Sequence, residues 1–156
     1  MKAIAWMTAV AALAALPAPA SASTSDPELI VYRFTGVRDD TGAVNTGTAT
    51  VFNCTNFSGV TENIRLVMRD GDGILMANVV VPVAHLSSTT VSTHATNAYL
   101  IEVALSTGSI SGGTTAIAAT SINVICTAMA IDASSLFPHG VALRGVRFNP
   151  IPGAQE

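Results

Sequence analysis

The chain has 156 residues and a formal net charge of −3, and its few arginines are scattered along the sequence. Because a nucleic-acid-binding protein needs clustered positive charge, nucleic acid is not expected as a partner. The hydrophobic share of 49% is too high for a disordered chain, and the length suits one folded domain.

The first residues predict a cleaved export signal. A basic Met-Lys start precedes an uncharged apolar run that continues to Leu16. Ala20-Ser21-Ala22 then has the small-x-small pattern that a signal peptidase accepts. We expect residues 1–22 to be removed and residues 23–156 to form a single exported domain, periplasmic or extracellular. No membrane span is expected after cleavage.

The remaining sequence is typical of short β-strands separated by turns. Ile64, Leu66 and Met68 alternate with polar neighbours, which is the period of a half-buried strand. Strands are expected at residues 28–34, 46–54, 61–69, 74–84, 98–105, 122–132 and 141–148. Turns are expected at residues 39–42, 56–59, 70–73 and 112–113. The segments 87–96 and 134–140 show no clear pattern.

The last expected strand loses its alternation at Gly145. A β-bulge at this glycine would let Leu143, Val146 and Phe148 all face inward. We therefore expect one continuous, bulged strand to close the domain.

These seven or eight short strands predict an all-β fold, namely an antiparallel β-sandwich that is immunoglobulin-like in architecture. An immunoglobulin domain proper also has a buried Trp and a Tyr two residues before its second Cys. Here that position is Val124, and the only Trp lies in the expected signal. The likeness is therefore to sandwich architecture alone.

Cys54 and Cys126 both remain after the expected cleavage. In an oxidising compartment an even number of cysteines favours a disulfide. Each cysteine shares the phase of apolar neighbours on its strand, so we expect a buried bridge that joins the two sheets.

Three histidines raise the possibility of a metal site. If the segment 87–90 formed a hairpin tip, His85 and His94 would face each other and could share a transition metal. His139 or Glu102 would then supply a third ligand. The alternative is a pair of surface histidines that flank a polar loop, in which case no cofactor is bound.

Enzymatic motifs are missing from the sequence. The segment 108–112 has the glycine frame of a hydrolase elbow, but Ile110 stands where the nucleophile belongs. No dinucleotide or phosphate-binding fingerprint occurs, and no pair of carboxylates follows from spacing. We therefore do not expect an enzyme.

The leading hypothesis is an exported, non-enzymatic β-sandwich protein with a binding or structural role, whose partner is a protein or a second copy of itself. One alternative is a self-assembling subunit of a surface fibre or coat, with residues 23–34 donated as a strand to a neighbour. Another is a small metal-binding protein that uses His85 and His94.

Overall fold

A computed structural model describes residues 28–40 and 44–148. The expected signal peptide, residues 1–22, lies outside the described residues. Within the described ranges the chain forms ten strands and no helix. The strands are β1 (Leu29–Asp39), β2 (Thr48–Asn56), β3 (Glu62–Arg69), β4 (Leu75–Val83), β5 (Ser88–Ser92), β6 (Val103–Ala104), β7 (Ile110–Ala119), β8 (Val124–Asp132), β9 (Gly140–Leu143) and β10 (Gly145–Arg147).

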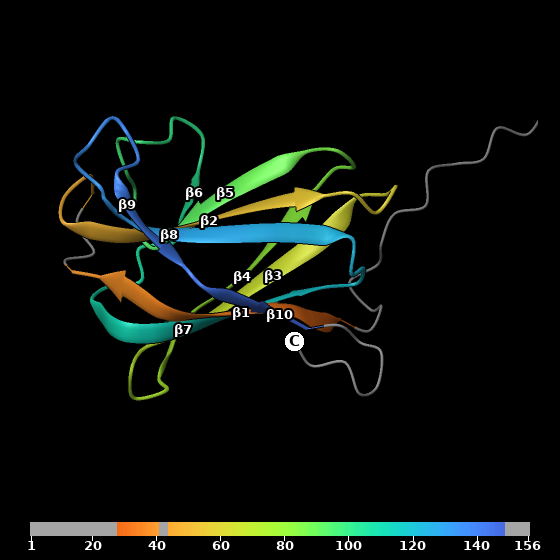
Figure 1. Ribbon diagram of the computed structural model, residues 1–156, viewed down its shortest axis with the longest axis horizontal. Helices are drawn as coiled ribbons and strands as arrows, with labels where there is room; N and C mark the ends of the chain where they lie inside the picture. Colours follow the sequence, from red (N-terminus) through yellow and green to blue (C-terminus); the bar gives the residue numbers. More distant parts are fainter. Residues whose placement is uncertain (1–27, 41–43, 149–156) are drawn as a thin grey trace, which may run out of the picture.

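The strands form two five-stranded sheets that pack face to face (Figure 1). One sheet has the order β10-β1-β7-β3-β4, and the other has the order β6-β5-β2-β8-β9. Every pairing is antiparallel except the short parallel contact between β5 and β6. The expected β-sandwich is therefore confirmed, with ten strands in place of seven or eight. No helix in the described part of the chain could cross a membrane.

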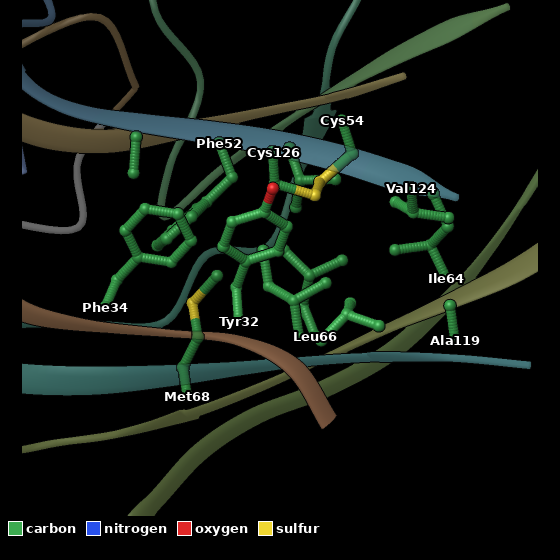
Figure 2. Close-up of a cluster of buried hydrophobic side chains, with 14 of the residues drawn as sticks. Tyr32, Phe34, Phe52, Cys54, Ile64, Leu66, Met68, Ala119, Val124 and Cys126 are labelled. Carbon is green, nitrogen blue, oxygen red and sulfur yellow. A yellow bond between two sulfur atoms is a disulfide. The ribbon is translucent and has the colours of Figure 1, made fainter. Parts of the chain in front are cut away.

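The core lies between the sheets and is built from alternate residues of the long strands (Figure 2). Ile64, Leu66 and Met68 are fully buried, as their alternation predicts. Phe34 and Phe52 come from opposite sheets and meet edge to face, with their ring centroids 5.7 Å apart. These contacts hold the two sheets together.

The predicted disulfide between Cys54 and Cys126 is present and buried. However, the expectation that it joins the two sheets is wrong. The two cysteines face each other on β2 and β8, which are neighbours in one sheet, and their Cα atoms are 4.2 Å apart. The reason is that alternation shows only that a cysteine points into the core. It does not show to which sheet its strand belongs.

The turn expected at residues 112–113 is also wrong, because both glycines lie inside β7. Gly112 has a φ of +73°, and the pairing with β1 shifts register between Val37 and Arg38. A glycine with positive φ thus marks a β-bulge within a central strand. The strand expected at 98–105 shrinks to the two residues of β6.

The strand expected at 141–148 is divided between the sheets. Its first half, β9, pairs with β8, and its second half, β10, pairs with β1. The loss of alternation at Gly145 therefore marks the point where the chain crosses from one sheet to the other, and not a bulge. Leu143 packs against the core as predicted, whereas Val146 is 41% exposed, so its inward prediction is wrong. A Cβ on Gly145 would lie 2.7 Å from Phe34 Cζ, which explains the glycine.

Candidate functional site

The structure does not bring the two predicted metal ligands together. The expected hairpin at 87–90 is wrong, because β5 pairs with β2. His85 and His94 therefore lie beyond opposite ends of β5. His85 is exposed, and its Nδ1 accepts a hydrogen bond from the N–H of Gly59 at 3.0 Å. Metal binding stays a prediction, now without the paired geometry on which it depended.

The other two candidate ligands have separate surroundings. Glu102 accepts hydrogen bonds from the backbone N–H and the hydroxyl of Thr96. His139 is exposed and lies edge-on to the ring of Phe137. In the described part of the chain, no group of three or more His, Cys, Asp or Glu is arranged to hold a metal ion.

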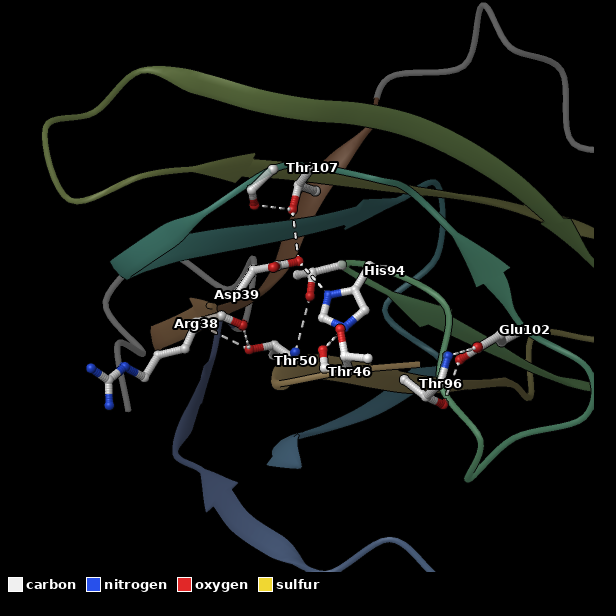
Figure 3. A network of polar contacts seen from close by, with 10 residues as sticks. Arg38, Asp39, Thr46, Thr50, His94, Thr96, Glu102 and Thr107 are labelled. Carbon is white, nitrogen blue, oxygen red and sulfur yellow. Dashed lines mark hydrogen bonds and ion pairs between the residues drawn. The ribbon is translucent and has the colours of Figure 1, made fainter. Parts of the chain in front are cut away.

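His94 is instead the centre of a buried polar network at one end of the sandwich (Figure 3). Its Nδ1 lies 2.7 Å from Oδ2 of Asp39, and its Nε2 lies 3.0 Å from the carbonyl oxygen of Thr46. The hydroxyl of Thr107 also donates to Oδ2 of Asp39, at 3.3 Å. The imidazole is 1% exposed and the carboxylate is fully buried.

Both neighbours of the His94 ring are oxygen acceptors, a carboxylate and a carbonyl. The ring donates to both only when each nitrogen carries a proton, and it then forms a buried ion pair with ionised Asp39. Each ring nitrogen has a partner inside the protein, so neither faces a substrate or a metal. The pair therefore has a structural role: it connects the end of β1, the β1–β2 connection and the segment after β5.

Thr50 makes a second tie at the same end of the sandwich. Its hydroxyl accepts from the N–H of Arg38 at 2.9 Å and donates to the carbonyl of Arg38 at 2.8 Å. The N–H of Thr50 in turn donates to the hydroxyl of Thr93 at 3.1 Å. These bonds fasten the end of β1 to β2 of the opposite sheet.

Three loops lie at this end of the sandwich, two of which contain residues of the network, and we call the three the loop platform. The loop platform consists of residues 44–47, 93–102 and 133–139. Three backbone hydrogen bonds of 2.8–2.9 Å connect the loops to one another: Asn45 N–H to Ala95 O, Asn97 N–H to Ala133 O, and Ala133 N–H to Gly47 O. Each loop is therefore hydrogen-bonded to both of the others.

The third loop of the platform is further ordered at its base. The hydroxyl and the backbone N–H of Ser134 both donate to Asp132, at 2.7 and 2.9 Å. These hydrogen bonds hold the pKa of the Asp132 carboxyl below its usual range. The carbonyl of Ser134 also accepts from the side-chain amide of Asn97, at 3.0 Å. The loop is thus tied both to its own strand and to the neighbouring loop.

Four large apolar side chains of the platform are each more than 70% exposed. They are Leu100, Ile101, Leu136 and Phe137, and between 71% and 101% of each is exposed. The two loops that carry them lie side by side at the upper left of Figure 1, in green and blue. Apart from Glu102, the platform contains no Asp, Glu, Lys or Arg.

The sequence patterns do not reveal these side chains. Leu100 and Ile101 lie in the strand expected at residues 98–105, and Leu136 and Phe137 lie in the segment 134–140, which shows no clear pattern. A usable signal is present, because two adjacent large apolar residues followed by Pro138 stand in a segment of Ser, His and Gly. Such a segment has the composition of a surface loop and not of a core strand.

A groove of about 570 Å³ opens beside the platform, between β1 and the β8–β9 pair. Most of its wall is apolar, and Arg38 and Asp132 contribute its charged side chains. The lining residues are Gly36, Arg38, Gly47, Thr48, Ala130, Ile131, Asp132, Val141 and Leu143. Because Gly47 belongs to both features, the groove is continuous with the loop platform.

Comparisons with known proteins assign no family to this chain. No family model matches it, and neither does any curated protein or solved structure. Its function must therefore be inferred from its own geometry.

Proposed function

We propose that this chain is an exported, non-enzymatic β-sandwich protein that acts by binding a partner through the loop platform. The main support for this proposal is the set of four large apolar side chains, each more than 70% exposed, on two loops that are hydrogen-bonded to each other. Burying one such side chain contributes roughly 1.5–3 kcal/mol. Soluble monomers rarely expose clusters of this kind without a binding role.

The rigidity of the platform supports the same role. Its three loops are hydrogen-bonded to one another, and His94 of the second loop pairs with the buried Asp39 of β1. A surface that is ordered before it binds loses little conformational entropy on association. The enclosed position of His94 also favours a structural function for this residue over acid–base catalysis.

Export is supported by two independent features. Residues 1–22 have the pattern of a signal peptide. The buried disulfide between Cys54 and Cys126 suits a chain that folds in an oxidising compartment. We therefore propose a location in the periplasm or outside the cell.

Assembly through donation of residues 23–34 is less favoured. Val31 and Phe34 are buried, and β1 pairs with β7 along its whole length and with β10 on its other side. Donation would remove this strand from its own core. Self-association is better supported at β4, which is the outermost strand of its sheet and carries no charged residue. An edge strand without charged residues can pair with a second chain, and Pro82 is the one residue of β4 that has no N–H to offer.

Site-specific photo-crosslinking in the producing cell tests both candidates. A photoreactive amino acid is placed at Leu136, at Val80 on β4, or at Leu86, an exposed control on a different loop. Binding through the platform predicts adducts at position 136 and none at position 86. Self-association predicts adducts between two copies at position 80. Equal labelling at positions 136 and 86 would contradict a specific binding role for the platform.

A further inference from the structure

The side chains of the loop platform protrude and do not form a hollow. Leu100 is 101% exposed, so no neighbouring group covers any part of it, and Ile101 is 90% exposed. A protein partner must offer pockets that match such projections closely, because protein interfaces are packed as densely as protein interiors. A fluid hydrocarbon layer accommodates a projecting side chain of any shape.

The charge of the platform also favours an uncharged apolar phase. Its one acidic group, Glu102, is bonded to Thr96, and the projecting side chains of Leu100, Ile101, Leu136 and Phe137 are uncharged. Placing a charged side chain in a bilayer is costly. Insertion of these four side chains does not incur that cost, because none of them is charged.

The backbone at the Phe137 tip is already hydrogen-bonded within its own loop. Its N–H donates to the hydroxyl of Ser135 at 3.2 Å, and its carbonyl accepts from that hydroxyl and from the N–H of His139, both at 2.7 Å. Pro138, at the same tip, has no N–H to satisfy. An apolar phase contains no water to pair exposed backbone groups, and the backbone of Phe137 keeps its hydrogen bonds on insertion.

We propose that the loop platform docks on the surface of a lipid bilayer, with Leu136 and Phe137 inserted below the headgroups and Leu100 and Ile101 beside them. This inference rests on the proposed function, whose partner it identifies. The net charge is negative and the four projecting side chains are uncharged, so attachment is apolar and not electrostatic. Attachment should therefore persist on neutral lipid and at high salt, where screening removes the attraction between charges.

Flotation of the purified, disulfide-bonded protein with neutral phosphatidylcholine vesicles tests the inference. The wild type should float with the vesicles, and raising the salt from about 0.1 M to about 1 M should not release it. In the double variant L136S/F137S the partition coefficient onto the vesicles should fall by at least roughly tenfold, because two inserted apolar side chains are lost. The matched control L86S changes a side chain that is 67% exposed outside the platform, and it should float like the wild type.

The outcomes separate the two proposals. If the wild type stays in the aqueous fraction, lipid docking is overturned, while crosslinking at position 136 to a protein would leave the binding role of the platform standing. If L136S/F137S floats as well as the wild type, docking through the platform is overturned. Thermal unfolding followed by circular dichroism verifies that each variant is folded, which is expected because the substituted side chains are exposed.

Discussion

Loss of the Cys54–Cys126 bridge should destabilise the domain by about 4 kcal/mol. The bridge spans a sequence separation of 72 residues. In the chain-entropy model, closing a loop of this length removes roughly 15 cal/mol/K from the unfolded ensemble, or about 4 kcal/mol near room temperature. Because a domain of this kind is stable by roughly 5–15 kcal/mol in total, the bridge supplies a large share.

The position of the bridge within one sheet decides what the reduced protein looks like. The cysteines face each other two residues from the end of a ladder that pairs β2 with β8 from Thr48 to Asn56. This ladder and the aromatic contacts between the sheets remain when the sulfur–sulfur bond is broken. We therefore expect the reduced protein to keep its fold and to lose stability mainly through its freer unfolded state.

Urea unfolding of the wild type, with and without reductant, measures this effect on a single sequence. The variant C54A/C126A serves as the control, because reductant has no bond to break in it. The order of stability should be oxidised wild type, reduced wild type, then the double variant, which also loses two buried sulfur atoms. An unchanged unfolding midpoint in wild-type protein whose thiols are shown to be free would refute the reasoning.

Two further predictions concern buried contacts. Replacing His94 with Ala leaves the buried carboxylate of Asp39 without its ring partner, and we expect a loss of about 3–5 kcal/mol in the free energy of unfolding. The exposed control H85A should change it by less than about 0.5 kcal/mol, and equal effects of the two variants in urea unfolding would contradict the network. Replacing Gly145 with Ala forces a methyl group against the ring of Phe34 and should cost about 1–3 kcal/mol. Thermal unfolding at the wild-type midpoint would show that the crossover between the sheets has room for a side chain.

The fold was most predictable where one face of a strand is buried and the other is not. In β3, Ile64, Leu66 and Met68 alternate with other residues. The alternation is visible in the sequence because one face of the strand contacts the apolar core and the other contacts water. In β7 the same reasoning failed at Gly113. This glycine exists because a Cβ there would overlap the backbone carbonyl of Arg69 on the neighbouring strand. Local sequence cannot distinguish such close approach from a turn.

The candidate site was less predictable because its contacts are not local. His94 and Asp39 are 55 residues apart in sequence, and only the pairing of β2 with β5 brings the histidine to the end of β1. Ile101 lies in an alternating segment, but a strand also needs a neighbour with a free edge. Only Val103 and Ala104 find one, in β5. The preceding residues are left as an exposed loop.

The disulfide also determines how the chain responds to a protease. Five of the ten strands, β3 to β7, lie between Cys54 and Cys126. A single cut in any connection between these strands leaves both pieces covalently attached through the bridge. A cut between β8 and β9, in the segment that carries Leu136 and Phe137, lies outside the closed loop and releases the C-terminal strands from covalent attachment. Like the connection between β1 and β2, the projecting loop lies outside the disulfide-closed segment, so one cleavage there separates the chain into two molecules.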